Sequence, residues 1–447
     1  AINQYKKAIK KDINLHSAQS GLITSSSHIC DWNDQETQND WLKSIGINGS
    51  AINPWDLFAL EDNPLKHLKR SQNLYKKNFI RKEGKIKSLK NKKIHLGYFS
   101  SDFRSHPTMY LLSSILKLHD KSSFDIYLYS FVPKEDEYTK IAKNSGCVFR
   151  DIREYDDIEA VELARKDKLD IAIDLNGYIK YHRMSIFSYR VAPIQINYLG
   201  FPGSVGSDTI DYILADRITI PKKNEQLYSE KIIRMPNCYQ CNDDTKEICK
   251  EKISKRDFNL PEKGFIFTCF NNNYKITQKE FNIWMRLIKE IEGSVLWLYR
   301  SNKWSINNLQ KEAIKRNIDP ARLIFADKLP LKKHLARHSL ADLALDTFNC
   351  NGHTTTSDAL WVGLPVLTKI GESFAARVSA SLLTSTGLPE LITYSEKEYE
   401  NKALYIARNP EYLANLKYKL IKSKKTSSLY NSKLFTKNLE FKLRELV

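Results

Sequence analysis

Two series of short apolar runs, alternating with amphipathic stretches, occupy most of the chain. The first series has β-rich runs at residues 94–100, 124–131, 169–175, 194–200 and 211–216, with helical periods between them in TMYLLSSILKLHD and DIEAVELARKDK. After a polar stretch at 237–260 the alternation restarts, with runs at 265–271, 295–300, 322–327, 343–348, 365–371 and 391–395. Strands that alternate with helices form parallel sheets covered on both faces. The pattern therefore predicts an α/β fold with two consecutive Rossmann-like domains, joined near residue 250.

The two ends of the chain have a helical pattern. Apolar residues in the first dozen positions recur with a helical period, and AINQYKKAIKKD resembles the second helix of a tetratricopeptide repeat. One such helix cannot bury its face alone, so it either follows upstream repeats or caps the next domain. The chain does not begin with Met, and we expect it to start inside a longer protein. We predict a helical segment and linker over 1–90, an N-terminal lobe over 91–250, and a C-terminal lobe over 251–447 that ends in two or three helices.

Two local signals mark helix starts. Thr277 and Glu280 have the spacing of a capping box before FNIWMRLIKEI. Pro107 can occupy the first position of a helix that begins just after His106.

Composition excludes several classes of protein. The 447 residues are 42% hydrophobic, which argues against a mostly disordered chain. No run approaches the roughly 18 apolar residues that a membrane span needs, so no membrane partner is expected, and the N-terminus has no apolar core of a secretory signal. Seven cysteines in this spacing do not resemble a disulfide scaffold, so the sequence favours the reducing cytoplasm.

The net charge of +18 raises nucleic acid, an anionic membrane or acidic ligands as partners. Much of it is Lys scattered among Asn and Ile, which is also typical of an AT-rich genome. Arg81 to Lys93 carries seven positive charges and Lys417 to Lys425 carries five. Such runs are usually solvated linkers or helix surfaces, so nucleic-acid binding is the less favoured interpretation.

Common catalytic motifs are missing. There is no GxxxxGK[ST] and no GxGxxG after a strand, which disfavours a kinase, a P-loop ATPase and a standard dehydrogenase. Cys238, Cys241 and Cys249 resemble half of a zinc site, but ordinary loop cysteines explain them better. His334 and His338 are four positions apart, but the Glu of a zinc protease motif is missing. The sequence contains no D-x-D motif, which argues against a Mg²⁺ site. We expect no metal.

The segment 343–368 carries the strongest signal. A strand leads into a tight turn at Asn351 and Gly352, and Thr354 to Ser357 then open a helix. The free N–H groups at such a helix start form a binding site for phosphate. The Thr and Ser residues would alternatively be ordinary N-caps. His353 at the turn and Asp358 in the helix favour a ligand, because a ribose needs a carboxylate acceptor.

Two more residues follow predicted strands. Lys275 comes after FIFTCF, where a lysine can neutralise the charge on a departing diphosphate without a metal. Taken alone, it would equally be a surface lysine. His106 lies in the loop after the first strand and can take a proton or donate a hydrogen bond, although a lone loop histidine is more often structural.

Together these segments resemble the O-linked N-acetylglucosamine (O-GlcNAc) transferases and the SPINDLY-type protein O-fucosyltransferases. The likeness runs from about residue 1 to the C-terminus, in the strings HICDWND, GYFSSDFRSHPT, DLNGYIK, RVAPIQINYLGFPGSVGSDTIDYILAD, YSEKIIRMPNCY, FNNNYKI, SVLWLYR, RLIFAD and LDTFNCNGHTTTSDALWVGLPVLT. The resemblance implies two Rossmann-like lobes of GT-B type facing a cleft, behind a tetratricopeptide superhelix that is mostly absent here. It implies inverting, metal-independent transfer of a sugar from a nucleotide diphosphate to Ser or Thr of proteins.

The resemblance also implies roles for individual residues. Lys275 would stabilise the diphosphate leaving group, and His106 lies where a base has been proposed in the family. The C-terminal lobe would bind the nucleotide sugar through Asn272, Leu329, His334, Arg337, Cys350, Gly352, His353, Thr354, Thr355 and Asp358. Within this set, Thr354 and Thr355 would hold phosphates, His353 phosphate or sugar, Asp358 the ribose, and His334 and Arg337 the base. Three residues would lie on the side of the acceptor and the sugar: Tyr178, Gly200 and Pro202.

Three positions depart from the animal enzymes and concern the donor. These enzymes carry Gln at Asn272, Lys at Leu331 and Thr at Ile179. Leu331 removes a ribose contact unless Lys332 compensates. The resemblance implies UDP-N-acetylglucosamine as donor, and these departures leave GDP-fucose or another sugar nucleotide as the alternative. A more distant alternative is a basic nucleic-acid-binding protein on a transferase fold.

Overall fold

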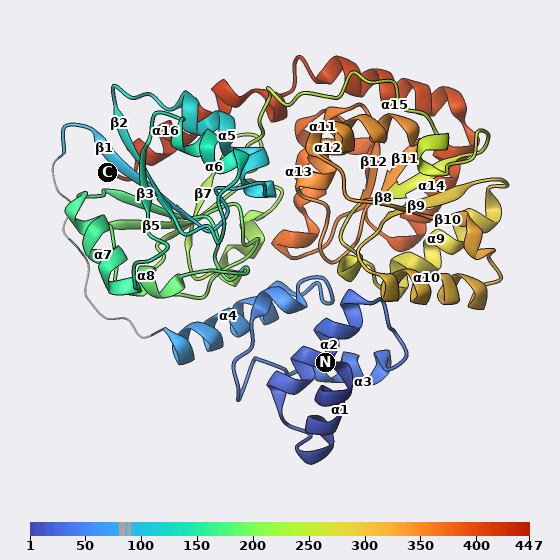
Figure 1. The fold of residues 1–447 in the computed structure, drawn as a ribbon, viewed down its shortest axis with the longest axis horizontal. Helices are drawn as coiled ribbons and strands as arrows, with labels where there is room; N and C mark the ends of the chain where they lie inside the picture. The colour runs from blue at the N-terminus through green and yellow to red at the C-terminus, as the bar shows by residue number, and fades with distance from the viewer. Residues whose placement is uncertain (80–85, 87–90) are drawn as a thin grey trace. The chain divides into compact units, whose positions relative to one another are not determined.

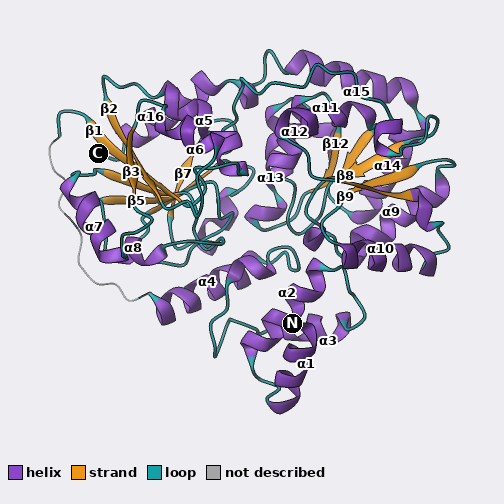
Figure 2. Cartoon of the chain, viewed as in Figure 1, coloured by secondary structure: helices purple, strands orange, loops and turns teal. Residues whose placement is uncertain are grey.

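Two sheets of parallel strands, each with helices on both faces, organise the protein (Figures 1 and 2). The structure is a computed structural model that describes residues 1–79, 86 and 91–447. The described residues divide into two units, the first formed by Ala1–Ile45, Asp56–Asp62 and Lys246–Ser427, and the second by Gly46–Trp55, Asn63–Thr245 and Ser428–Val447. This architecture confirms the predicted α/β fold with two Rossmann-like domains. The domain boundaries near residues 90 and 250 stay predictions.

The second unit contains a seven-stranded sheet in the order β3-β2-β1-β4-β5-β6-β7. Its strands are β1 Ile94–Ser100, β2 Phe124–Ser130, β3 Val148–Asp151, β4 Ile171–Asp174, β5 Ile194–Asn197, β6 Tyr212–Ala215 and β7 Lys231–Arg234. Its helices are α4 Pro64–Asn78, α5 Pro107–Leu118, α6 Glu137–Lys143, α7 Asp157–Lys166, α8 Met184–Ser188 and α16 Ser432–Arg444. The five predicted runs form β1, β2, β4, β5 and β6. The sequence pattern missed β3 and β7, because these short edge strands mix charged residues with few apolar ones.

The first unit contains a six-stranded sheet in the order β10-β9-β8-β11-β12-β13. Its strands are β8 Ile266–Cys269, β9 Val295–Tyr299, β10 Leu323–Ala326, β11 Leu343–Leu345, β12 Val366–Lys369 and β13 Ile392–Thr393. Its helices are α1 Ile2–Lys11, α2 His16–His28, α3 Gln35–Trp41, α9 Gln278–Glu290, α10 Lys303–Lys315, α11 Leu331–Arg337, α12 Thr354–Trp361, α13 Val378–Ser385, α14 Glu396–Arg408 and α15 Pro410–Ser423. Each of the six predicted runs contains one of these strands.

Each sheet has one point where the chain reverses its direction of growth across the sheet. In the second unit the chain builds β1, β2 and β3 outward on one side and then returns to place β4 beside β1. In the first unit the same reversal puts β11 beside β8. Ligands of doubly wound folds bind at the carboxyl ends of the two strands that flank this point. The loops after β1, β4, β8 and β11 are therefore where function is expected.

Both predicted helix starts are confirmed. Thr277 and Glu280 form a capping box at the start of α9. Pro107 is the first residue of α5, and His106 is its N-cap.

The N-terminal residues form a pair of packed helices, α1 and α2. A buried cluster of Ile9, Ala18 and Leu22 joins them. The Tyr5 ring crosses α2 at Gly21, where a Cβ atom would stand only 2.4 Å from the ring. Glycine is thus required by the close approach of the two helices. The predicted N-terminal helix is confirmed, and its assignment to a tetratricopeptide repeat stays a prediction.

The C-terminal residues form three helices, α14, α15 and α16, as predicted. The basic run from Lys417 to Lys425 lies mainly on α15, and several of its lysines have partners within the unit. Lys417 pairs with Asp342, Lys419 with Glu390, and the Lys424 ammonium lies 3.5 Å from the Trp361 ring centroid. Most of the other basic run, 81–93, lies outside the described residues.

Two further findings concern the described part of the chain. None of its helices combines the length and apolar character needed to cross a membrane. It also contains no group of three or more His, Cys, Asp or Glu side chains that could hold a metal ion. Cys238 and Cys241 are buried, and Cys249 is half-buried.

Helix α16, red in Figure 1, belongs to the unit of β1 and is anchored there by a buried carboxylate. Glu440 Oε1 accepts hydrogen bonds from the backbone N–H of Asp120 at 2.7 Å and from Nδ1 of His119 at 3.0 Å. The other ring nitrogen of His119 lies 2.9 Å from the Tyr98 hydroxyl. The last helix is therefore tied to β1 through one hydrogen-bonded chain.

We expect Glu440→Ala to lower the free energy of unfolding by about 2 to 3 kcal/mol, because it leaves two buried N–H donors without an acceptor. Urea unfolding followed by circular dichroism measures the change. The matched control is Glu445→Ala at the C-cap of the same helix, whose carboxylate is half exposed (49%) and pairs with Lys442; its effect should stay within about 0.5 kcal/mol. Equal effects of the two substitutions would contradict the assigned role of Glu440.

Candidate functional site

The carboxylate of Asp346, directly after β11, organises the loops at the reversal point of the first unit. Its Oδ1 accepts hydrogen bonds from the backbone N–H of Gly352 at 2.7 Å and from Asn271 Nδ2 at 3.1 Å. Its Oδ2 accepts the hydroxyl of Thr368 at 2.7 Å. Burial raises the pKa of Asp346, and these hydrogen bonds offset part of the rise. One buried side chain thus joins the loop after β8, the loop after β11 and strand β12.

Gly352 is required where these loops meet. A Cβ atom there would stand 2.5 Å from the Thr356 hydroxyl, 2.6 Å from the Thr355 hydroxyl and 2.9 Å from Asn271 Oδ1. The Thr355 hydroxyl itself donates to Asn271 Oδ1. Strand β11 ends earlier than the predicted run, at Leu345, so Gly352 closes a longer loop instead of a tight turn directly after the strand. The predicted helix start is confirmed, because α12 begins at Thr354.

The amino end of α12 carries N–H groups and a histidine nitrogen that can hydrogen-bond a ligand. The N–H groups of the first helical turn have no acceptor within the helix, and the helix dipole places about half a positive charge there. His353 is the N-cap, and its buried Nε2 has no hydrogen-bond partner among the described residues. Burial, together with the charge of Lys275, lowers the pKa of His353 to about 3. The ring is therefore neutral and available to hydrogen-bond a ligand.

Lys275 brings a positive charge to the same place. The short helical turn Asn273–Lys275 after β8 directs its ammonium to the carbonyl oxygen of Asn351, at 2.8 Å. Burial alone would lower the pKa of Lys275, but the Cys350 thiol, the Tyr274 phenol and the Asp346 carboxylate hold it above its ordinary value. Lys275 is thus a half-buried, charged lysine fixed by the site. A single ammonium beside a helix amino terminus can bind an anion such as a diphosphate.

A second group of predicted residues lies on α11. Arg337 is buried, with its guanidinium 4.5 Å from the ring centroid of Phe270. Its Nη2 lies 2.7 Å from Nδ1 of His334, and its Nη1 donates to the carbonyl oxygen of Asp327 at 2.6 Å. Burial lowers the pKa of Arg337 to about 10 and that of His334 well below its ordinary value. We call the amino end of α12 together with Lys275 the anion site. Because Phe270 directly follows β8, it links the group on α11 to this site.

The remaining predicted residues of this unit differ in their exposure. Asn272 is exposed, and its side-chain oxygen accepts the Ser301 hydroxyl at 3.4 Å. Leu329 is half-buried in the loop between β10 and α11. Asp358 lies on α12 and forms a buried ion pair with Lys246. Lys332, the residue considered as a substitute for the lysine missing at Leu331, instead pairs with Glu247 on the surface.

In the second unit, the predicted catalytic histidine follows β1. His106 Nδ1 accepts the backbone N–H of Thr108 at 3.3 Å, which caps α5. This bond assigns the proton of the neutral ring to Nε2. Burial lowers the pKa of His106, and the Asp102 carboxylate, 3.6 Å from Nδ1, only partly opposes the change. The geometry thus favours a neutral ring that donates a hydrogen bond from Nε2.

Asn176, after β4, ties its loop to that of His106. Its Nδ2 donates to the Ser101 hydroxyl at 2.7 Å and to Asp102 Oδ2 at 3.2 Å, while its Oδ1 accepts the N–H of Ser101 at 3.0 Å. The two loops at the reversal point of this sheet are therefore held together by one amide.

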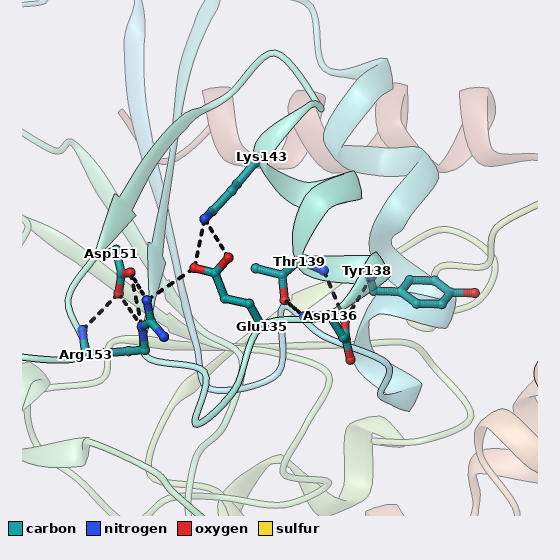
Figure 3. Close-up of polar contacts among 7 residues, drawn as sticks. All are labelled: Glu135, Asp136, Tyr138, Thr139, Lys143, Asp151 and Arg153. Carbon is teal, nitrogen blue, oxygen red and sulfur yellow. Dashed lines mark hydrogen bonds and ion pairs between the residues drawn. The ribbon is translucent and has the colours of Figure 1, made fainter.

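The other side of the His106 loop is fixed by Asp136, whose contacts at the start of α6 are drawn in Figure 3. Its Oδ1 accepts the N–H groups of Tyr138 and Thr139 at the start of α6, and its Oδ2 accepts the N–H of Ser105 at 2.6 Å. Burial alone would raise the pKa of Asp136, but these donors hold it below its ordinary value. One carboxylate thus caps α6 and positions the residue next to His106.

The neighbouring Glu135 is held by two cations in the same view (Figure 3). Lys143 donates to Glu135 at 2.8 Å, and Arg153 bridges Glu135 at 3.2 Å and Asp151 at 2.6 Å. This network fixes the loop after β2 from which Asp136 reaches the His106 loop.

The three residues predicted on the acceptor side are packed in the loops after β4 and β5. Tyr178 is buried, and its hydroxyl donates to the carbonyl oxygen of Val205 at 2.6 Å. Its ring meets the Phe201 ring edge-on, with centroids 5.3 Å apart. A Cβ on Gly200 would stand 2.0 Å from the Leu175 carbonyl oxygen, so the loop after β5 requires glycine here. Pro202 is buried in the same loop.

Sequence reasoning missed the residues that hold these loops in place. They are Asp102, Asp136, Asn176, Lys246, Asn271 and Asp346. Most of them are polar residues that end up buried close to the end of a parallel strand, a signal that was present in the sequence for Asn176, Asn271 and Asp346. Nothing in the sequence pattern marked Lys246, because its partner lies 112 positions away on α12.

Known proteins resemble this chain over most of its length. The sequence profile of glycosyl transferase family 41 matches residues 65–253 and 246–439. A probable UDP-N-acetylglucosamine-peptide N-acetylglucosaminyltransferase SEC of Arabidopsis thaliana is 35% identical over 368 residues, covering 81% of this chain and 37% of that protein. A probable SPINDLY enzyme of the same description from Solanum lycopersicum is 30% identical over 362 residues, covering 77% and 38%. The chain thus spans less than two fifths of the length of these two relatives.

A solved structure agrees with the fold. A mutant O-GlcNAc transferase of Thermobaculum terrenum superposes with a TM-score of 0.86 at 24% identity, covering 100% of this chain and 86% of that chain. At this identity the likeness concerns the fold, and it confirms the predicted GT-B type with its N-terminal helices.

The histidine at the end of α11 allows a pH test of the first unit. His338 is buried beside a cavity of about 20 Å³, also lined by Asn271, Asp346 and Thr355. Such a cavity has room for about one water molecule. His338 Nδ1 donates to the carbonyl oxygen of His334 at 2.7 Å. Burial lowers the pKa of His338 to about 4.

Because this pKa lies below the unfolded value of about 6.5, the folded state binds the proton less tightly, and stability is lost as the pH falls below that value. We expect His338 to cost the wild type about 2 kcal/mol between about pH 7.5 and pH 5. His338→Gln, which keeps a donor for the His334 carbonyl, should lack this part of the decline in urea unfolding. Parallel pH profiles of the two proteins would disprove the assignment.

Proposed function

The chain belongs to glycosyltransferase family 41, and from this premise we propose that it is the catalytic part of a protein O-glycosyltransferase. It moves N-acetylglucosamine from UDP-N-acetylglucosamine to Ser and Thr hydroxyls of proteins, with inversion at the anomeric carbon and without a required metal. The observation that carries the proposal is the meeting of the Lys275 ammonium with the amino end of α12 after β8 and β11. The names of the relatives support the donor and the acceptor class.

The proposed mechanism assigns the leaving group to the first unit. The acceptor hydroxyl attacks the anomeric carbon in line as the bond from that carbon to the phosphate oxygen breaks. The electron pair leaves on the nucleoside diphosphate, and the hydroxyl proton is released to water. Lys275 and the N–H groups of Thr354 and Thr355 compensate the charge that develops there. The unpaired Nε2 of His353 supplies a further hydrogen bond to phosphate or sugar. In a half-buried site such fixed groups act more strongly than they would in water.

For His106 we propose hydrogen-bond donation and not proton abstraction. Its Nδ1 is used by the N–H of Thr108, so the neutral ring carries its proton on Nε2. A ring in this form can orient a substrate oxygen from Nε2, but it has no lone pair there to take a proton. Asp102, Asn176 and Asp136 fix the loop that presents it.

The donor base separates two related proposals. Leu331 stands at the start of α11, beside the group of His334 and Arg337 that we propose to contact the base. The SPINDLY relative shows that the chain is also similar to that branch, so the alternative is a protein O-fucosyltransferase that uses GDP-fucose. Protein acceptors, the cytoplasm as the site of action and the absence of membrane or nucleic-acid partners stay predictions.

The transfer reaction itself can be measured by mass spectrometry. Candidate acceptor proteins are incubated with the chain and, in separate reactions, with UDP-N-acetylglucosamine, UDP-glucose or GDP-fucose. We expect Ser and Thr peptides to gain one N-acetylhexosamine with the first donor only. Gain of a deoxyhexose with GDP-fucose would favour the SPINDLY-type alternative. No transfer from any donor, together with nucleic-acid affinity that falls steeply with salt, would refute the proposal.

Replacement of Lys275 tests the leaving-group assignment. We expect Lys275→Ala to reduce turnover about a hundredfold or more, because the departing diphosphate loses its only side-chain cation in the proposed mechanism. The matched control is Lys279→Ala, an exposed lysine in the first turn of α9, which should retain wild-type turnover. Full transfer by a folded Lys275→Ala protein would contradict the mechanism.

A further inference from the structure

A buried ion pair joins the polar stretch after strand β7 to helix α12. The Lys246 ammonium lies 2.8 Å from Asp358 Oδ1, and the two side chains are only 3% and 4% exposed. Removing two charges from water costs free energy unless they pair with each other or bind a ligand. Asp358 lies on α12, the helix whose amino end we propose as the anion site.

The residues after Lys246 bind the segment to α11. The N–H of Cys249 donates to the carbonyl oxygen of Lys332 at 3.1 Å, and Glu251 pairs with Lys333 at 3.0 Å. Glu247 also pairs with Lys332. Residues 246–251, which we call the strap, therefore connect α12 at Asp358 with α11. These are the helices that carry the anion site and the Arg337 group.

The location of the pair matches the order of groups in a nucleoside diphosphate. If the phosphates bind at the start of α12 and the base lies by α11, the ribose lies between them. Asp358 is one helical turn beyond Thr354 on α12, and its charge acts on His338 at the end of α11. The pair thus lies next to the place where a ribose would bind.

The chemistry of the pair also suits a sugar diol. An ammonium has three N–H donors and a carboxylate about four acceptor positions. Within the described residues, the structure assigns one donor of Lys246 and one acceptor position of Asp358 to their mutual bond. The pair can therefore donate to one ribose oxygen while it accepts a proton from another. Lys246 also neutralises Asp358, which would otherwise repel an incoming diphosphate.

We propose that Lys246 is a specificity-determining residue of the nucleotide site: paired with Asp358, its ammonium binds the ribose hydroxyls of the nucleoside diphosphate. This inference rests on the proposed function, because it needs a nucleoside diphosphate in the first unit. It assigns to the strap the ribose contact that Leu331 does not provide, and it gives the site selectivity for ribose over deoxyribose.

The test compares UDP with 2′-deoxy-UDP, or GDP with 2′-deoxy-GDP if the protein prefers guanosine. The dissociation constants are measured by calorimetry on the full chain. We expect the wild type to bind the ribonucleotide about tenfold or more tightly, since a hydrogen bond to a charged group is lost without the hydroxyl. In Lys246→Met this ratio should fall to near one, and affinity for the ribonucleotide should drop about tenfold. A ratio of affinities is informative because changes in stability or net charge affect both ligands equally.

Lys250→Met is the matched control, because Lys250 is an exposed lysine of the same strap. It should keep the wild-type ratio. If the wild type binds a nucleoside diphosphate and Lys246→Met retains the full ratio, the role of Lys246 is wrong while the proposed function stands. If the wild type binds neither UDP nor GDP, the proposed function fails and this inference fails with it.

A second measurement on the wild type keeps the inference testable should Lys246→Met not fold. Periodate-oxidised UDP carries aldehydes at the 2′ and 3′ positions and forms an imine with a nearby lysine, releasing water; borohydride then fixes the bond. We expect peptide mapping to find the label on Lys246 and to find it suppressed by excess UDP. Labelling confined to other lysines would overturn the inference.

Discussion

The buried carboxylate of Asp346 is the interaction on which the arrangement of the first unit depends. It stands at the end of β11, where the sheet reverses its order, and gathers donors from the loop after β8, the closing turn at Gly352 and strand β12. A carboxylate that leaves water must be satisfied by such donors. Because Asp346 is satisfied in this way, the amino end of α12, His353 and Lys275 are brought to one place.

Burial acts differently on the charged and the neutral groups of this site. The histidines His334, His338 and His353 all lose affinity for protons on burial, so they provide hydrogen bonds without charge. Lys275 keeps its charge, because the groups around it offset the cost of burial. The amino end of α12 and the Lys275 ammonium thus supply the positive charge of the candidate anion site, and the Arg337 guanidinium supplies that of the group on α11. The Lys246–Asp358 pair adds polarity without net charge.

In each unit, the two loops at the reversal point of the sheet are joined by the same kind of hydrogen bond between different residues. After β1 and β4 the loops are joined by Asn176 and Asp102, and after β8 and β11 by Asn271 and Asp346. In both units an amide side chain donates to a buried carboxylate across the point where the sheet reverses. The sequence predicted that these loops would carry chemistry, since each follows an apolar run and precedes a helical pattern. It did not identify the carboxylates, whose donors come from distant segments.

The sequence by itself determined the alternation of strands and helices, the helix starts at Pro107, Gln278 and Thr354, and the loops in which Lys275 and His106 stand. These features depend on local periodicity and on residues a few positions apart, so a single chain segment carries the whole signal. Only the tertiary structure decided that edge strands β3 and β7 form, that Asp346 accepts hydrogen bonds from three separate segments, and that Lys246 faces Asp358. Each of these depends on which distant backbone or charge comes near, and that is settled by the packing of parallel strands and not by the pattern along the chain.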